Sequence, residues 1–276
     1  MNRYDFIYLF DCIDANPNGD PDAGNLPRLD PESGQGITTD VMLKRKIRNY
    51  VHMKCGDVSP NKIYVQSRDI ALSSVRKEAH EQKSETPKDW MCKNFYDIRS
   101  FGAVMSMKEA NCGQVRGPVQ ISFARSIDRI ITAEHAITRC SAETEKEINK
   151  ETGDNRTMGR KFTVPYGLYR AHGFINPFLA EQTGFSDDDR ELLFTALENA
   201  FQFDQSAARP AGSMNPRGLL IFEHDSQLGS APSHKLLDAV SIKRKSTVEV
   251  ARCFDDYDIS IDRSAIPSGV TLIRRI

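Results

Sequence analysis

The 276-residue sequence has no long apolar run, which excludes a membrane-spanning helix of ordinary length. Such a helix needs about 18 or more consecutive apolar residues, and no stretch approaches that length. The apolar run FIYLF near the N-terminus is too short for a signal peptide and is followed directly by the acidic Asp11. We therefore expect a cytoplasmic protein with no membrane partner.

The motifs of common metal, redox and hydrolytic sites are also missing. Six cysteines stand far apart without a C-x-x-C pair, which argues against a zinc knuckle and against a disulfide framework. The six histidines form neither H-E-x-x-H nor H-x-H, and the sequence has no G-x-S-x-G, no GKS or GKT loop and no dinucleotide fingerprint. We expect no metal and no cofactor.

Net charge gives no global sign of a nucleic-acid partner, because 37 Lys and Arg are balanced by 38 Asp and Glu. The 39% hydrophobic and 27% charged residues are ordinary for a globular protein with a real core. Any binding surface must therefore come from local clusters of charge.

Hydrophobic patterns predict a series of strands and helices. A helix should begin at Thr39 or Asp40 and end at Gly56, and a second should be capped by Ser186. Residues 62–97 are polar and predict a helical insertion on the surface, and the charged segment 141–156 predicts a projecting hairpin or a disordered tip. Strands are expected at 3–13, 98–106, 117–130, 160–177 and 217–226.

The resulting order of elements is β, α, β, β, β, α, β with insertions, and no internal repeat is present. Strands separated by two amphipathic helices favour an α+β fold of the ferredoxin-like or RNA-recognition type.

The loop DANPNGDPDAGNLPRLDPESGQG, from Asp14 to Gly36, imitates a calcium loop in its first half. Asp14, Asn16, Asn18 and Gly19 occupy the first, third, fifth and sixth positions of that motif, but Asn25 stands where a bidentate Glu is required. Another interpretation is that Asp14, Asp20 and Asp22 gather a divalent ion for attack on a phosphodiester. The plainer interpretation is a series of Asn-Gly and Asp-Pro turns.

Basic residues cluster on one side of the helix that follows. Leu43, Ile47 and Tyr50 fall on one face at helical spacing, while the bases fall on the other, exposed face. Such bases can neutralise successive phosphates, although most charged helix faces are simply solvated. The bases are Lys44, Arg45 and Arg48, and five more recur in or beside the middle strands: Arg99, Arg116, Arg125, Arg129 and Arg139.

Five segments together resemble one known family. They are YLFDCIDANPNGDPDAGNLPRLDPESGQGITTDVMLKRKIRNYV, IRSFGAVMS, RGPVQISFARSID, ITR and TMGRKFTVPYGLYRAHGFINP, spread from Tyr4 to about Phe222. The chain resembles the Csd-type backbone subunit of Cascade, the CRISPR surveillance complex, in its type I-C form. The resemblance implies a non-catalytic protein that binds CRISPR RNA and presents it for pairing with the complementary strand of target DNA.

The resemblance also implies the fold and the assembly. It implies a single hand-shaped RNA-binding domain over residues 1–276: a modified RNA-recognition (ferredoxin-like) palm with helical fingers at 56–97 and a thumb hairpin at 126–165. Copies would stack head to tail along the RNA, with other type I-C Cascade subunits at the filament ends.

Carried onto this sequence, the resemblance implies RNA-binding residues in four places. Met158 would be the wedge beside a base, and the other thumb residues would contact phosphate. The residues are Asn18, Gly19 and Asp20 in the loop; Thr39, Lys44, Arg45 and Arg48 on the helix; Arg99, Ser100, Phe101, Gly102, Arg116 and Gln120 on the palm; and Arg139, Met158, Arg160 and Lys161 in the thumb.

Two other functions stay open at this point. Related backbone subunits of type III complexes cut RNA with an aspartate in a comparable loop, so a metal-dependent ribonuclease using Asp20 and Asp22 is one alternative. A protein-only filament with incidental basic patches is the other.

Overall fold

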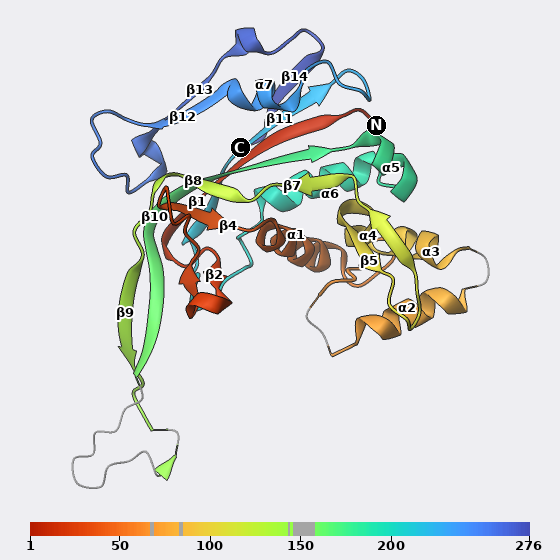
Figure 1. The fold of residues 1–276 in the computed structure, drawn as a ribbon, viewed down its shortest axis with the longest axis horizontal. Helices are drawn as coiled ribbons and strands as arrows, with labels where there is room; N and C mark the ends of the chain where they lie inside the picture. The colour runs from red at the N-terminus through yellow and green to blue at the C-terminus, as the bar shows by residue number, and fades with distance from the viewer. Residues whose placement is uncertain (67–68, 83–84, 143, 146–157) are drawn as a thin grey trace.

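A central antiparallel sheet organises this mixed α/β protein (Figure 1). The computed structural model describes residues 1–66, 69–82, 85–142, 144–145 and 158–276. The strand order is β14-β11-β1-β10-β8-β4, and the short strands β7 and β9 also pair with β10. Their bounds are β1 Tyr4–Ala15, β4 Gln35–Thr38, β7 Val119–Ile121, β8 Ala124–Arg129, β9 Ala133–Thr138, β10 Met158–Ile175, β11 Met214–His224 and β14 Val270–Arg274.

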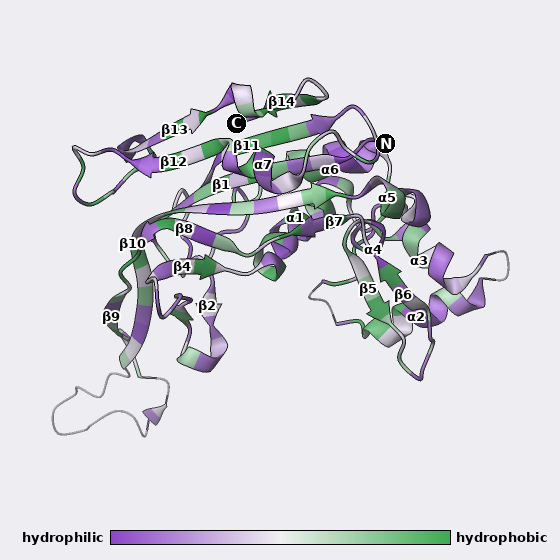
Figure 2. Cartoon of the chain, turned by 45° about the horizontal axis from the view of Figure 1, so that its top comes forward, coloured by the Kyte–Doolittle hydropathy of each residue, from purple (hydrophilic) through white to green (hydrophobic). Residues whose placement is uncertain are grey.

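Strand β1 is buried on both of its faces. Phe6 and Phe10 point into one hydrophobic core, and Ile7 and Leu9 point into a second core on the other side of the sheet. Because successive side chains of a strand alternate between faces, burial on both sides requires an unbroken apolar run. This explains why FIYLF lacks polar alternation, and Figure 2 shows a similar hydrophobic stretch along the middle of the neighbouring strand β11.

Helices α1 (Asp40–Cys55) and α6 (Asp187–Glu198) cover the first face and pack against each other. The predicted helix signals are confirmed: Thr39 and Gly56 flank α1, and the Ser186 side chain accepts a hydrogen bond from the N–H of Asp189 at the start of α6. Along the chain the order is β1-α1-β8-β10-α6-β11, while in space these strands lie in the order β11-β1-β10-β8. A short helix, α5 (Pro177–Thr183), follows β10.

The second face is covered by the C-terminal segment, in which the sequence predicted no element. It contains α7 (Ser233–Asp238), β12 (Val240–Arg244) and β13 (Tyr257–Ile261), whose apolar residues join the second core. Arg170 of β10 donates hydrogen bonds to the carbonyl oxygens of Leu237 and Val240, at 2.6 and 2.8 Å. This arginine therefore anchors the end of α7 to the sheet.

A separate helical module lies beside the sheet. It comprises α2 (Leu72–Glu81), α3 (Pro87–Asn94), α4 (Tyr96–Phe101), β5 (Gly102–Met105) and β6 (Gly113–Arg116). Helices α2 and α3 lie within residues 62–97, where the sequence predicted a helical insertion on the surface. The module has its own hydrophobic core, which extends from Tyr64 to Val115.

The prediction of a strand at 98–106 is wrong in its first half, because α4 continues to Phe101. Gly102, with φ of +77°, ends this helix. A Cβ at Gly102 would lie 2.3 Å from the carbonyl oxygen of Val115, so only glycine fits there. The strand begins after this turn.

A hairpin formed by β9 and the start of β10 projects away from the sheet (Figure 1). The expected projecting or disordered tip at 141–156 lies mostly outside the described residues. The described residues also form short 3₁₀ turns at Pro21–Ala23, Phe254–Asp256 and Arg263–Ala265. None of the helices within the described ranges is long and apolar enough to cross a bilayer.

The burial of His172 predicts that the stability of the protein depends on pH. Burial, followed by the neighbouring Arg170 guanidinium, lowers the pKa of His172 to about 4 from its ordinary 6.5. The folded state therefore binds a proton less readily than the unfolded chain, and the free energy of unfolding should fall as pH drops from 6.5 towards 4. His172→Gln should reduce this fall, which urea unfolding at several pH values would measure. His234→Gln, at an exposed histidine, is the control, and equal flattening by both variants would contradict the assignment.

Candidate nucleic-acid interface

The loop after β1 folds into a small two-stranded ladder. β2 (Gly19–Asp20) pairs with β3 (Leu26–Pro27) across a 3₁₀ turn. A Cβ at Gly19 would lie 1.9 Å from Oδ1 of Asn25, so a larger residue would displace the Asn25 side chain. The Asp20 carboxylate forms an ion pair with Arg28 at 3.3 Å and accepts a hydrogen bond from the N–H of Asp22. Among the described residues, no group of three or more His, Cys, Asp or Glu is arranged to hold a metal ion.

Asn18 joins this loop to the start of α1. Its Oδ1 accepts hydrogen bonds from the N–H of Thr39 at 2.9 Å and from the Thr39 hydroxyl at 3.1 Å. The Thr39 Oγ1 in turn accepts from the N–H of Met42. A side-chain oxygen of the loop thus holds Thr39, the residue that caps the start of α1. The contact fixes the loop against the helix.

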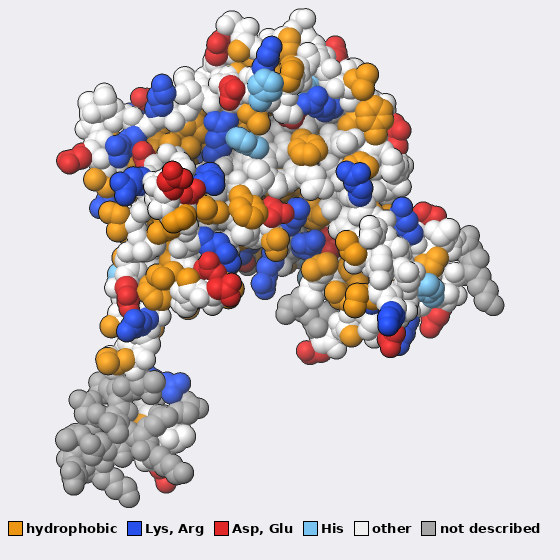
Figure 3. Space-filling view, in the orientation of Figure 1, with side chains coloured by type: hydrophobic (Ala, Val, Ile, Leu, Met, Phe, Trp, Pro, Cys, Tyr) orange, Lys and Arg blue, Asp and Glu red, His pale blue; other side chains and the backbone are white. Residues whose placement is uncertain are grey.

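An open groove of about 510 Å³, which we call the α1 groove, lies between this loop and the first turns of α1. Figure 3 shows basic side chains interspersed with acidic ones along this lower edge of the protein. The groove brings together four predicted residues and several that the sequence did not single out. Its lining is Pro17, Asn18, Gly19, Arg28, Thr39, Asp40, Val41, Met42, Arg45, Lys46, Phe123, Asp204 and Arg209.

Two of the groove cations are held by one carboxylate. Asp204 forms ion pairs with Lys46 and, at 3.2 Å, with Arg209. Burial lowers the pKa of Lys46, and the adjacent Asp204 opposes that shift. Arg209 also donates to the carbonyl oxygen of Asn16, so the pair of cations ties the loop to the helix. The charges of Lys46 and Arg209 are therefore largely neutralised by Asp204 within the protein.

Arg45 differs from these cations. It is exposed and, within the part of the chain that the structure describes, forms no ion pair. Its position on the second turn of α1 places its charge at the mouth of the groove. Arg45 is therefore the groove cation that is available to an external anion.

Lys44 and Arg48 are not on an exposed face, which corrects the prediction. Lys44 pairs with Asp40 at 2.8 Å and Arg48 with Asp97 at 2.9 Å, and their side chains are only 14% and 12% exposed. Both lie over the ring of Phe101, at 5.7 and 5.2 Å from its centre. The helical module packs on this side of α1, which helical periodicity alone could not reveal.

The segment from Arg99 to Phe101, predicted to supply palm surface, is buried. Arg99 forms a 2.6 Å ion pair with Asp189 and donates to Asn61, and Ser100 is fully enclosed. The Arg99–Asp189 ion pair holds α4 against α6, and all three side chains are buried, so the prediction of a surface role for them is wrong. Gly102 is partly covered at the end of α4.

Two further palm residues lie closer to solvent. Arg116 is exposed at the end of β6, and Gln120 is partly buried and donates to the carbonyl oxygen of Gly117.

The predicted thumb residues lie together on the β9–β10 hairpin, away from the α1 groove (Figure 1). Met158 is 75% exposed, Arg160 forms an ion pair with Glu134 at 3.0 Å, and Lys161 is partly exposed. Arg139 is exposed just after β9. The hairpin thus presents one large apolar side chain and several bases to its surroundings.

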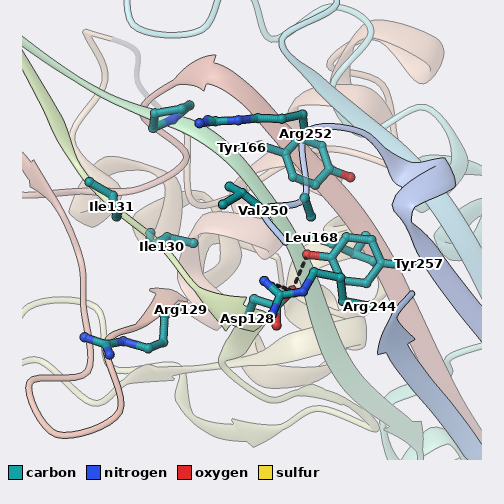
Figure 4. Close-up of a pocket in the computed structure, with 13 residues that line it drawn as sticks. Asp128, Arg129, Ile130, Ile131, Tyr166, Leu168, Arg244, Val250, Arg252 and Tyr257 are labelled. Atoms are coloured by element: carbon teal, nitrogen blue, oxygen red, sulfur yellow. Dashed lines mark hydrogen bonds and ion pairs between the residues drawn. The ribbon is translucent and has the colours of Figure 1, made fainter. Parts of the chain in front are cut away.

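A second cavity, shown in Figure 4, lies between the base of the hairpin and the C-terminal segment. Its volume of about 160 Å³ is below the roughly 300 Å³ at which ligand sites for small molecules begin. Its polar groups bond one another: the Tyr257 hydroxyl donates to Asp128 at 2.8 Å, and Arg244 lies 4.0 Å from the same carboxylate. We interpret this cavity as a packing gap.

Comparison with known proteins identifies similar chains. A family model described as CRISPR-associated protein Cas7 matches residues 2–262. A curated CRISPR-associated protein Cas7 from Haloferax volcanii is 26% identical over 246 residues, which cover 82% of this chain and 71% of the relative. A solved chain of a "CRISPR RNA-guided surveillance complex, pre-nicking" has a TM-score of 0.51 and 15% sequence identity. The superposition covers 80% of this chain and 78% of the solved one, and this likeness shows a shared fold. A chain of another "CRISPR RNA-guided surveillance complex" gives 0.46 at 15% identity, covering 80% and 69%.

The ion pair of Arg48 predicts a loss of stability. Arg48→Ala would leave the fully buried Asp97 carboxylate with only the N–H donors of Tyr64 and Val65, and should lower the free energy of unfolding by about 3 kcal/mol. Urea unfolding measures this change. Arg45→Ala, three residues earlier on the same helix, is the matched control and should change stability little. If both substitutions lowered the free energy of unfolding by the same amount, the stabilising role assigned to the Arg48–Asp97 ion pair would be wrong.

Proposed function

This chain belongs to the CRISPR-associated Cas7 family, and on that premise we propose that it binds CRISPR RNA as a backbone subunit of a surveillance complex. The observation that carries the proposal is the α1 groove, an open channel in which Arg45 is an exposed and unpaired cation among the described residues. Single-stranded RNA is held chiefly through its phosphates, and a groove with a free arginine provides such a contact.

The groove suits recognition of RNA shape rather than sequence. Arg45 would neutralise a phosphate, while Arg28, already paired with Asp20, would line the path of the strand. Asn18 and Thr39 would act by fixing the loop beside the helix. In such a complex the base sequence is read by pairing with the complementary strand of target DNA, and the protein contacts the backbone.

We further propose the hand architecture of a type I-C subunit. The palm would be the sheet with α1 and α6, whose strand order β11-β1-β10-β8 and β-α-β-β-α-β sequence support a modified RNA-recognition fold. The fingers would be the helical module, from residue 56 past 97 to the end of its core at Val115. The thumb would be residues 126–165, with Met158 as the wedge and Arg139, Arg160 and Lys161 beside phosphate.

Assembly would be head to tail along the RNA. The β9–β10 hairpin projects at one side of the protein and the helical module lies at the other (Figure 1), so two different surfaces are offered to neighbouring copies, as a heterologous contact that repeats without closing requires. Other subunits of the complex would cap the filament ends. A protein-only filament would instead purify without RNA, so an absorbance ratio at 260 and 280 nm typical of protein alone would favour that alternative.

RNA retention should depend on Arg45. Arg45→Ala should weaken binding of single-stranded RNA and flatten the log–log dependence of affinity on salt by about 0.7, the value for one lost phosphate contact. Fluorescence anisotropy with a labelled RNA across several salt concentrations measures the slope. Arg263→Ala, at an exposed arginine in the C-terminal segment, should leave the slope unchanged. An unchanged slope in Arg45→Ala would remove the α1 groove from the proposed interface.

The ribonuclease alternative is tested directly. Because Asp20 is paired with Arg28 and bonded to the N–H of Asp22, we expect labelled RNA to stay intact with Mg²⁺ or Mn²⁺. Denaturing gels after long incubation would show this. Cleavage that disappears in Asp20→Asn, with Asp30→Asn as the control in the same loop, would establish a nuclease and overturn the non-catalytic proposal.

A further inference from the structure

Phe123 is an exposed aromatic residue in the α1 groove. It lies between β7 and β8, is 55% exposed, and lines the groove together with Arg45 and Asn18. Its neighbours along the chain, Ile121 and Ala124, are buried in the core. The pairing of the neighbouring strands gives a local cause for this exposure.

The cause is a one-residue bulge. Ile121 pairs with Gly173, but Arg125 pairs with Arg170, so four steps along β7 and β8 oppose three steps along β10. Ser122 bridges the extra residue: its N–H donates to the carbonyl oxygen of His172, and its hydroxyl accepts from the N–H of His172. The N–H and carbonyl of His172 are therefore both satisfied across the interruption.

The bulge decides where the phenylalanine points. In a regular strand, residues two apart share a face, so Phe123 would follow Ile121 into the core. The extra residue shifts the alternation by one, Ala124 takes the inward position, and the phenylalanine is turned out into the groove. Bulges of this kind re-aim side chains beside functional sites.

We propose that Phe123 stacks on a nucleobase of RNA held in the α1 groove, next to the phosphate that Arg45 neutralises. The inference rests on the proposed function, because it assigns an additional contact within the same groove. Every base has a π-face, so stacking holds a strand without selecting its sequence. That property suits a protein whose guide sequences vary, and this contact lies apart from the thumb residue Met158.

The experiment that tests this inference combines measurement of RNA affinity with photocrosslinking. The probe is a single-stranded RNA of about eight nucleotides, in the size range of a single-strand binding site, carrying 5-iodouridine at successive positions. We expect a light-induced crosslink that maps to the peptide containing Phe123. Phe123→Leu should remove this crosslink and weaken binding roughly tenfold, in keeping with loss of one base–aromatic contact. Phe123→Tyr, which keeps a ring, should bind like the parent protein.

The controls separate the inference from its premise. Phe178→Leu removes another partly exposed phenylalanine, located on α5, and should change neither signal. If the parent protein binds no RNA, the proposed function fails. If it binds RNA with the expected dependence on Arg45, but the crosslink maps elsewhere and Phe123→Leu has parent affinity, only the stacking inference is overturned. Normal RNA binding with impaired association of copies would assign Phe123 to a protein contact and also overturn it.

Discussion

The burial of β1 on both faces is the constraint on which the rest of this structure depends. One strand supplies Phe6, Tyr8 and Phe10 to the core beneath α1 and α6, and Ile7 and Leu9 to the core beneath the C-terminal segment. The Tyr8 hydroxyl donates to the carbonyl oxygen of Leu197 in α6, which links the strand to a helix through the core itself. Two layers are therefore fixed to one strand, and the loop that leaves this strand inherits a defined position.

The groove owes its form to that position. The loop begins where β1 ends, and Asn18 then accepts hydrogen bonds from Thr39, the cap of the helix that packs on the same strand. Asp204 secures the opposite wall through Lys46 and Arg209. Most charged side chains near the groove thus form ion pairs that hold backbone segments together. Among the described residues, the groove surface left for a ligand includes Arg45, which has no ion pair there, a few polar groups and the ring of Phe123.

Local signals in the sequence predicted the elements that are stabilised locally. Thr39, Gly56 and Ser186 act through their own backbone neighbours, so the ends of α1 and α6 could be read directly. The partners of Arg48 and Arg99 are Asp97 and Asp189, which lie 49 and 90 residues away in the sequence. No periodicity indicates such pairings, and this is why the exposed helix face and the first half of the strand at 98–106 were predicted wrongly.

The residues of the candidate site also fall into a group that the local sequence predicted and a group that it did not. Asn18, Gly19, Thr39 and Arg45 belong to two adjacent elements and were identified together, whereas Arg209 reaches the groove from a distant loop. Phe123 illustrates a different limit, since alternation along a strand predicts the wrong face wherever a bulge adds a residue. The resemblance to a known family could supply a function but could not supply these contacts.

Strand β10 runs without interruption from the projecting hairpin into the sheet. Residues 158–163 pair with β9, and pairing with β1 begins at Val164. The hairpin is therefore a continuation of the sheet, and its length is set by the number of residues in its two arms. Lengthening both arms by two residues would move its end outward by about 7 Å and preserve which side chains face which way, while a change of one residue would reverse them. Insertions of two residues in each arm would therefore extend the hairpin with its side-chain pattern intact, whereas a single inserted residue would have to form a bulge, as it does between β7 and β8.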